Sequence, residues 1–481
     1  MSNLSDLLPT GGGQNAVDFV ASGTLSSGQA VVLNSDGTVS AVGFGGPASG
    51  TPIVFEAAST YYISSTYDTL NNKIVIVYQD SGNSEYGTAV VGTVNGTSIS
   101  FGTPVIFLSG ESNWFSCTFD TANNKVVIAY SDRTGTPTNK AVVGVVSGTN
   151  ITFGAAVTFG ASYGSRFSAT FDSSNNKIVI AYQDGGNADQ GTAIVGTVSG
   201  TSISFGSSVV FQSSSTSNIG TAFDSNSNKI VVVYRNDGNS SYGTAIVGTV
   251  SGTSISFGSA VVFESSRSDG NVATFDSNNN KIVIAYQDPV NTDAGTVIVG
   301  TVSGTSISFG SPVVIDTSVS TFFTATFDGN ANKVVVSYID NGNSSYGTAV
   351  VGTVSGTSIS FGTPVIFENS SVSWLSATFD SSSNAVVLSY RDDGNSGHGS
   401  SAVFQTSASN NTDFIGITAE AIADTATGAV NVYGGINEAQ SGLTIAADYY
   451  VQPDGAISTT VSDVRIGQAI SATTINIRDL T

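Results

Sequence analysis

Short apolar segments alternate with turns rich in Gly, Asn and Ser along most of the chain, and this pattern predicts β-strands. Apolar runs of about four to eight residues between such turns are typical of strands. No segment of the repeated part keeps the period of an amphipathic helix. The copy around Asp276 shows the pattern most fully and predicts four strands, A to D, over residues 270–275, 281–286, 295–301 and 306–315.

This four-strand pattern recurs seven times at a constant spacing of 52 residues. Each copy has an aromatic residue followed by Asp, then four residues, a position that is Lys in six copies, and an apolar segment ending in Tyr. Four short strands in a period of about 40–50 residues are typical of a β-propeller blade. The Asp of the motif is Asp68, Asp120, Asp172, Asp224, Asp276, Asp328 and Asp380.

The ends of the array distinguish a closed propeller from an open solenoid. The last copy has strands A to C but no strand D, whereas an extra strand D at residues 50–55 precedes the first copy. Its Phe55 is in register with Phe107 of the next strand D. An N-terminal strand that completes the last blade removes the exposed edges of an open array, while a solenoid would carry polar caps. We therefore expect residues 50–406 to form a closed seven-bladed β-propeller.

The flanks, residues 1–49 and 407–481, leave this propeller from the same blade and both contain strand signals. Strand–turn–strand patterns occur at 27–39 and at 449–457, the latter with an Asp-Gly hairpin turn. Because the ends of an inserted domain lie close together, we expect the flanks to form one small all-β domain with the propeller inserted in it. Two separate tails are the alternative.

Charge and composition exclude several classes of function. The 481 residues include 14 Lys and Arg against 35 Asp and Glu, for a formal net charge of −21. Such a charge argues against a nucleic-acid partner, because phosphate binding needs a basic surface. With one Cys and one His, neither a disulfide framework nor a metal centre is expected, and no cofactor is implied. The chain shows no membrane-spanning run and no signal peptide pattern, which predicts synthesis in a cytoplasm.

The flanks resemble virion surface proteins of marine tailed bacteriophages. The resemblance lies in NLSDLLP at 3–9, GGG at 11–13, SGLT at 441–444, DYYV at 448–451 and RIGQAISATT at 465–474. Such proteins are tail-fibre-like or capsid-decorating, and a small β domain attaches their larger displayed part. The resemblance implies a location on the virion surface, several copies or a homo-oligomer, and other virion proteins as partners of the split domain. It supplies no catalytic motif.

One register of the repeat marks a candidate binding site. The segments between strand D and the next strand A differ in every copy, whereas the A–B and C–D turns barely change. Aromatic faces stack on sugars or bases, and Arg and Asn add directional hydrogen bonds. Packing of the two Trp side chains between blades is the alternative interpretation. The ring that this register predicts around the propeller axis is Tyr62, Trp114, Arg166, Asn218, Gly270, Phe322 and Trp374, and all except Gly270 are candidate ligand-binding residues.

Two further patterns admit a chemical interpretation. The Asp-x-Gly-Asn loops after strand B suit either Ca²⁺ ligation or an Asx turn, and the turn is favoured because Asp and Asn are common turn residues. A glycosidase needs two carboxylates facing a cleft. The mouth offers Asp269 and Glu111, in different blades and without matching partners.

The sequence thus predicts a non-enzymatic structural protein that displays a β-propeller on a phage particle, as a tail fibre or capsid decoration. Its variable face would contact host surface glycans or neighbouring virion proteins, and it would neither enter a membrane nor bind nucleic acid. Two alternatives stay open. A free-standing propeller lectin would keep its binding without the flanks, and a glycan-cleaving enzyme would depend on carboxylates of the mouth.

Overall fold

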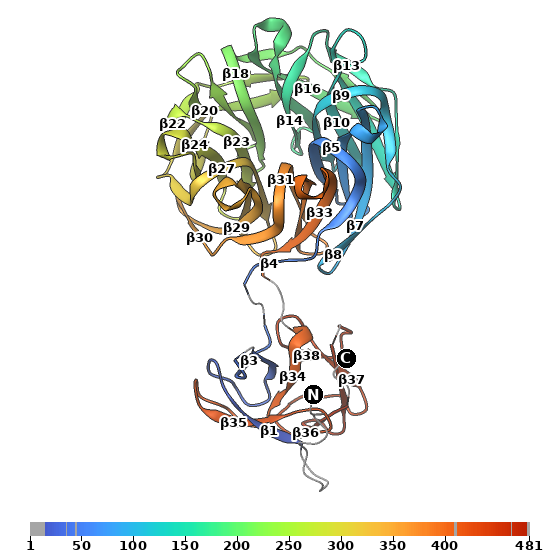
Figure 1. Cartoon of the computed structure of the whole chain (residues 1–481), viewed down its shortest axis with the longest axis vertical. Helices are drawn as coiled ribbons and strands as arrows, with labels where there is room; N and C mark the ends of the chain where they lie inside the picture. Colours follow the sequence, from blue (N-terminus) through green and yellow to red (C-terminus); the bar gives the residue numbers. More distant parts are fainter. Residues whose placement is uncertain (1–14, 35, 44–45, 408–410, 463, 479–481) are drawn as a thin grey trace. The chain divides into compact units, whose positions relative to one another are not determined.

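The chain is all-β over residues 15–34, 36–43, 46–407, 411–462 and 464–478, which this computed structural model describes. Its named strands pair antiparallel, and its helical segments are single 3-10 turns. None of these described helices has the length and apolar character needed to cross a membrane. The residues up to Gly46 and from Ser407 form one compact unit, the flank unit, and Pro47 to Thr406 form a second, the repeat unit (Figure 1).

Each copy of the repeat contributes the same strands to the repeat unit. Strand B is β6 (Lys73–Asp80), β10 (Lys125–Asp132), β15 (Lys177–Asp184), β19 (Lys229–Asn236), β24 (Lys281–Asp288), β28 (Lys333–Asp340) and β32 (Ala385–Asp392). Strand C is β7 (Tyr86–Asn95), β11 (Thr138–Ser147), β16 (Gln190–Ser199), β20 (Tyr242–Ser251), β25 (Ala294–Ser303), β29 (Tyr346–Ser355) and β33 (His398–Gln405). Short 3-10 turns follow strand B at η2 (Ser81–Asn83), η3 (Gly185–Asn187), η4 (Pro289–Asn291), η5 (Asn341–Asn343) and η6 (Asp393–Asn395).

The predicted strand D is two strands rather than one. The first part pairs with the end of strand C and is β8 (Ser98–Phe101), β12 (Asn150–Phe153), β17 (Ser202–Phe205), β21 (Ser254–Phe257), β26 (Ser306–Phe309) or β30 (Ser358–Phe361). After β26, Gly310 donates its backbone N–H to the Val299 carbonyl at 2.9 Å, and Pro312 has no N–H to offer. The same break occurs in copies that carry Ala156, Ser208 or Ala260 at the position of Pro312, so the missing N–H of Pro is not required for it.

The variable segments between strands D and A, expected to be loops, lie mostly inside continuous strands. Five long strands join the second part of D to the next strand A: β5 (Ile53–Asp68), β9 (Val105–Asp120), β18 (Val209–Asp224), β27 (Val313–Asp328) and β31 (Val365–Asp380). Two copies divide this strand, into β13 (Val157–Gly160) and β14 (Gly164–Asp172) and into β22 (Val261–Arg267) and β23 (Asp269–Asp276). The segments are rich in small polar residues, so the apolar alternation that signals a strand is missing from them.

The N-terminal strands of the repeat unit pair with its last copy. β4 (Ala48–Ser49) lies opposite Phe404 and Gln405, and the start of β5 lies opposite the start of β33, with Ile53 beside Ser401. Figure 1 shows β4, β5 and β33 side by side, and successive sheets around a common centre. Because of this pairing, residues 48–49 belong to the repeat unit rather than to the N-terminal flank, where the sequence had placed them.

The core of the repeat unit lies between neighbouring sheets. Val75 and Val77 of one copy pack with Val126 and Ile128 of the next. The Tyr that closes each strand B is fully or almost fully buried. Cys117 is 7% exposed and is a packed small residue, as the sequence predicted, and burial raises the pKa of its thiol to about 12.

The flank unit contains two sheets and one η turn, η7 (Asn411–Asp413), among the described residues. The first sheet has the order β1 (Ala16–Val20), β35 (Thr427–Asn431), β34 (Phe414–Thr418), β2 (Ala30–Leu33) and β3 (Val39–Ala41). The second has the order β36 (Ile436–Asn437), β40 (Ile475–Ile477), β39 (Val464–Ala469), β37 (Asp448–Val451) and β38 (Ile457–Ser458).

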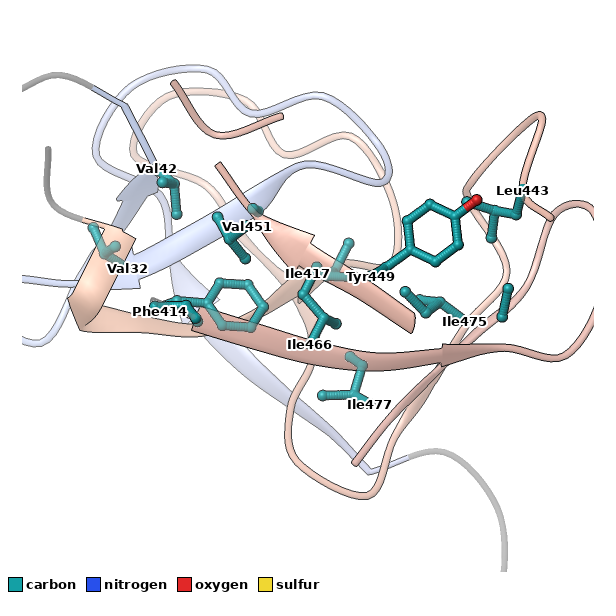
Figure 2. Close-up of a cluster of buried hydrophobic side chains, with 13 residues drawn as sticks. Val32, Val42, Phe414, Ile417, Leu443, Tyr449, Val451, Ile466, Ile475 and Ile477 are labelled. Atoms are coloured by element: carbon teal, nitrogen blue, oxygen red, sulfur yellow. The ribbon is translucent and has the colours of Figure 1, made fainter. Parts of the chain in front are cut away.

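Both ends of the chain contribute to one hydrophobic core of the flank unit. Figure 2 shows Val32 and Val42 from the N-terminal side near Phe414, Ile417 and other residues from the C-terminal side. Tyr449, in one of the phage-like motifs, is part of this core. The phage-like motifs at 3–9 and 11–13 lie outside the described residues.

Candidate functional site

A β-bulge recurs at the predicted ring position in all seven copies. In β5, for example, the pairing with β6 shifts register between Tyr61 and Ser64, and Tyr62 lies within the shift. All seven residues adopt left-handed backbone, with φ between 50° and 62°. For residues other than Gly and Asn this conformation costs about 1–2 kcal/mol, and bulges serve to redirect a side chain. The ring residues with this geometry are Tyr62, Trp114, Arg166, Asn218, Gly270, Phe322 and Trp374.

Four ring residues form an aromatic cluster. The ring centroid of Tyr62 lies 4.3 Å from that of Trp374 and 5.0 Å from that of Trp114. Phe322, which is 45% exposed, meets Trp374 edge-on at 5.6 Å. Trp114 and Trp374 are both half-buried, so the packing interpretation and the exposed-platform interpretation each describe part of what these side chains do.

The other half of the ring is polar. The Arg166 guanidinium stacks on Trp114 at 5.0 Å from the ring centroid, which joins the two halves. Arg166 donates through Nη1 to Asn218 Oδ1 at 3.1 Å, and Asn218 donates through Nδ2 to Asp269 Oδ1 at 3.0 Å. Six of the seven ring residues, all except Gly270, therefore form a continuous chain of contacts that runs from Phe322 to Asp269.

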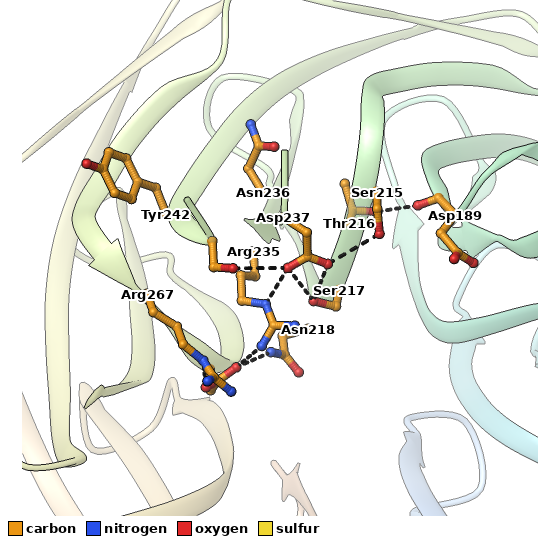
Figure 3. A network of polar contacts seen from close by, with 12 residues as sticks. Asp189, Ser215, Thr216, Ser217, Asn218, Arg235, Asn236, Asp237, Tyr242 and Arg267 are labelled. Atoms are coloured by element: carbon orange, nitrogen blue, oxygen red, sulfur yellow. Dashed lines mark hydrogen bonds and ion pairs between the residues drawn. The ribbon is translucent and has the colours of Figure 1, made fainter. Parts of the chain in front are cut away.

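Arginines hold Asp269 and the neighbouring Asp237, and Figure 3 shows Asp237 beside Arg235. Arg235 bonds both carboxylates, with 2.6 Å from Nε to Asp237 Oδ1, and Arg267 Nε lies 2.7 Å from Asp269 Oδ2. Ser217 also donates to Asp237, at 3.1 Å. Burial is the largest single effect and opposes the charge of Arg235, but the hydrogen bonds and negative charges of Asp237 and Asp269 together outweigh it and raise the pKa of the guanidinium. Both carboxylates are thus well satisfied.

Arg166 differs from these arginines because it has no carboxylate partner. None of the ion pairs between described residues includes it. Burial, and then the positive charge of Arg235, lower the pKa of its guanidinium, and Asp237 and Asp269 oppose this only at longer range. A guanidinium has five N–H donors, and the one side-chain hydrogen bond that Arg166 makes to a described residue uses a single nitrogen.

These residues enclose a cavity of about 370 Å³ in the repeat unit. Of the six candidate residues, Trp114, Arg166, Asn218, Phe322 and Trp374 line it, whereas Tyr62 packs behind the two Trp side chains. Gly270 lines it too, and the absence of a side chain there leaves a gap in the ring between Asn218 and Phe322. The cavity is therefore aromatic on one side and polar on the other.

Asn271 is a lining residue that the candidate set omits. It is only 2% exposed, and neither Oδ1 nor Nδ2 has a hydrogen-bond partner in the described part of the chain. Buried amides are normally paired, so an unpaired one beside a cavity indicates a place for a polar ligand or water. A signal was present in the sequence, because the other six residues at this register are apolar: Ile63, Phe115, Phe167, Ile219, Phe323 and Leu375.

The remaining sequence hypotheses have simpler structural outcomes. The carboxylates of Asp184, Asp340 and Asp392 accept backbone N–H groups of the following 3-10 turns, which confirms the Asx-type interpretation for these copies. Within the described ranges, no three His, Cys, Asp or Glu side chains gather as metal ligands. Glu111 pairs with Arg133 at 3.1 Å and does not line the cavity, so it is not paired with Asp269.

The geometry thus defines an all-β repeat protein with an aromatic and polar cavity that residues of its bulges line. No known protein family and no curated protein matches the sequence. Among solved structures, the chain is similar to the BP39L lectin from Burkholderia pseudomallei, with 11% identity and a TM-score of 0.53 over 71% of this chain and 94% of the lectin.

Two other solved structures also match this chain. A chain of the Mitotic Checkpoint Complex is 9% identical, with a TM-score of 0.50 over 74% of this chain and 94% of that one. A protein of unknown function from Dyadobacter fermentans DSM 18053 is 12% identical, with a TM-score of 0.47 over 75% of this chain and 99% of that protein. At such identities the likeness to the lectin and to the checkpoint chain concerns the fold alone.

Proposed function

We propose that the repeat unit is a closed seven-bladed β-propeller whose central cavity binds a glycan. The proposed closure is supported by the pairing of β4 and β5 with β33 and by the contacts that run between successive A strands and back from β31 to β5. Such a closure leaves no sheet edge exposed at the ends of the array. The lectin-like fold is compatible with this function.

The observation that carries the proposal is the composition of the cavity. It joins the faces of Trp374 and Phe322 to the unpaired amide of Asn271 and the free donors of Arg166. Sugars present both C–H faces and hydroxyl groups, so they need apolar platforms together with directional polar groups. The strained backbone at the ring adds support, because non-Gly residues held in the left-handed region cluster at ligand sites.

We propose that the protein binds this glycan without cleaving it. Most glycosidases use two carboxyl groups that flank the scissile bond. The cavity lining in the described residues provides one carboxylate, Asp269, and Arg235, Arg267 and Asn218 already engage it. Such a group is poorly placed to act as a nucleophile or as a general acid.

Tryptophan fluorescence tests the proposal directly, because both Trp residues of the chain line the cavity. Full-length protein is titrated with a panel of bacterial surface polysaccharides and their oligosaccharides. We expect a saturable spectral shift, and calorimetry should give one ligand per chain, since Gly270 and Asn271 each interrupt their register only once. Trp114→Phe and Trp374→Phe each leave one reporter and identify which indole responds.

Gly270→Asn is the variant that we expect to lose glycan binding. Asn tolerates left-handed backbone and occupies the same position in the preceding copy, at Asn218, so the fold should persist while the gap in the ring closes. Leu70→Ala, at an exposed A–B turn, is the control that keeps binding. A flat titration across the panel, or binding that Gly270→Asn leaves intact, would contradict the proposed site.

We further propose that the flank unit attaches the propeller to a phage particle, in several copies. This proposal rests on the likeness of the flank sequences to marine phage virion proteins. The hydrophobic core that both flanks share is compatible with a folded anchoring domain. Antibody labelling of purified particles under the electron microscope tests it. Labelled capsids or tails would support the anchor, and protein found only free in the lysate would favour a free-standing lectin.

A further inference from the structure

We propose that the glycan bound in the central cavity is an acidic one, and that Arg166 pairs with the carboxylate or sulfate that it carries. This inference rests on the proposed glycan binding and names the class of glycan. An arginine normally meets a planar anion through two parallel N–H bonds. Arg166 lines the cavity and has no anionic partner among the described side chains, and its bond to Asn218 leaves other N–H donors available.

The stacking of Arg166 holds its guanidinium in position before such a ligand binds. Its guanidinium lies on the Trp114 ring at 5.0 Å and is fixed on its edge by Asn218. A cation held by a ring face and one amide is oriented, but its charge is not neutralised. A guanidinium that is fixed in advance loses less side-chain freedom when an anion binds.

The charges around Arg166 favour an anion at this position. Arg235 and Arg267 occupy Asp269, and Arg235 also occupies Asp237. Three arginines therefore face two carboxylates, and the excess positive charge falls on Arg166. The chain as a whole has a net charge of −21 and therefore repels polyanions. A preference for an acidic glycan would have to come from this local excess of positive charge.

Asn271 supplies a second, independent indication of a polar ligand. It lines the same cavity, is 2% exposed, and its carbonyl oxygen and amide nitrogen are both unpaired. It can accept from one hydroxyl and donate to another, as neighbouring hydroxyls of a sugar ring require. A uronic acid or a sulfated sugar would place its anion at Arg166, its hydroxyls at Asn271 and its apolar face toward Phe322 and Trp374.

The test compares polysaccharides that differ only in charge. Polyglucuronate, its carboxyl-reduced neutral form and the sulfated derivative of that form are each titrated against full-length protein by tryptophan fluorescence. We expect the acidic polymers to bind about 10- to 100-fold more tightly than the neutral one. The preference should persist at about 0.5 M NaCl, because a partly buried pair is screened little. A preference for carboxylate over sulfate, or the reverse, identifies which anion the site takes.

Variants at Arg166 assign the preference to this residue. Arg166→Gln should remove the difference between acidic and neutral polymers, and Arg166→Lys should keep part of it, because Lys retains the charge but not the planar fork. Arg391→Gln is the matched control: Arg391 also stacks on an aromatic ring, Tyr61, at 4.3 Å, but does not line the cavity. A merely structural role for Arg166 would lower all affinities together and leave their ratio unchanged.

The outcomes separate this inference from the proposed function. Equal affinity for acidic and neutral polymers, or an acidic preference that survives Arg166→Gln, overturns the acidic-glycan inference and leaves glycan binding standing. A protein that binds neither these polymers nor any member of the wider panel overturns both. Circular dichroism and the melting temperature of Arg166→Gln are measured alongside. If that variant is unfolded, the acidic-glycan inference is tested with Arg166→Lys and with the comparison of polymers on the unmodified protein.

Discussion

At the scale of single residues, stability and binding make opposite demands on the cavity. The register of Asn271 packs neighbouring sheets together and is apolar in the other six copies, whereas Asn271 is buried there without a partner. Burying an unpaired amide is unfavourable. The protein therefore carries a locally destabilising residue at the one place where the ring is open, beside Gly270.

Asn271→Leu should stabilise the protein and weaken glycan binding. The change restores the residue type found at Leu375 and removes an unsatisfied buried group, so the free energy of unfolding should rise by about 1–3 kcal/mol. Denaturant unfolding measures the first effect, and the fluorescence titration measures the second, with at least a tenfold loss of affinity expected.

Leu375→Asn is the reciprocal control. It should lower stability without creating a second site, because position 374 carries Trp instead of Gly and the ring is closed there. If Asn271→Leu were destabilising, Asn271 would have a structural partner, such as buried water, and would not be an open ligand contact.

At the scale of elements, hydroxyl groups join strand A of five copies to strand A of the next copy. Strand A is the inner edge of its sheet, and in five copies a Ser or Thr two residues after the ring position accepts a backbone N–H from the following copy. Ser116, for instance, accepts from Ala169 at 2.9 Å. Gly220 and Val272 break the series on both sides of the copy that contains Gly270 and Asn271. The inner edges are therefore least connected beside the cavity.

Ser116→Ala should lower the free energy of unfolding by about 1–2 kcal/mol, because it leaves the Ala169 N–H without its partner in the inner edge. Ser116→Thr keeps the hydroxyl, as Thr324 does naturally, and should stay within about 0.5 kcal/mol of the unmodified protein. Urea denaturation distinguishes the two variants. Equal destabilisation by Ala and Thr would point to packing rather than to the hydrogen bond.

The element scale also marks where sequence reasoning succeeds and fails. The strands B and C and the Asn-rich A–B turns were predictable, because their apolar runs and turn residues are local signals; Asn280, for example, has the expected left-handed backbone, with φ 54°. The bulge at Tyr62 was not predictable, because neither Tyr nor Trp favours that conformation and only the surrounding sheet imposes it. The long strand β27 was missed for a similar reason: its polar Ser and Thr positions give no alternation.

At the scale of the whole molecule, the repeat unit depends on two segments that are far apart in the chain. Phe55, 7% exposed, belongs to the same hydrophobic cluster as Val387 and Val403 of the last copy. The register of Phe55 was sufficient to predict this partnership from the sequence. The cavity was predictable only in part. The 52-residue period brings the ring positions together, but the ion pairs of Asp269 with Arg235 and Arg267 depend on side-chain geometry that the sequence does not show.

A fragment of residues 47–406 should fold as a monomer and keep glycan binding, because the cavity and all its lining residues lie within it. A fragment of residues 60–406 lacks β4 and the part of β5 that pairs with β33. It should lose more than about 3 kcal/mol, roughly the contribution of one buried Phe side chain. Thermal unfolding and size-exclusion chromatography test both fragments.

Complementation provides the control for the shorter fragment. A synthetic peptide of residues 47–60 should restore much of its stability, and the same peptide with Phe55→Ser should not. A shorter fragment that is as stable as residues 47–406 would show that the N-terminal strand is dispensable, and would count against the proposed closure.

The pairing of β5 with β33 also has a consequence for biosynthesis. Ile53 and its partner Ser401 are separated by about 350 residues, so the ribosome makes one long before the other. At a translation rate of about 5–20 residues per second, the first strand waits ~20–70 s for its partner. During that interval every nascent chain presents an unpaired strand edge, and on a polysome several such chains are neighbours. Glu56, near the start of this strand, gives the unpaired segment a negative charge, and charge on a strand edge opposes pairing between adjacent chains.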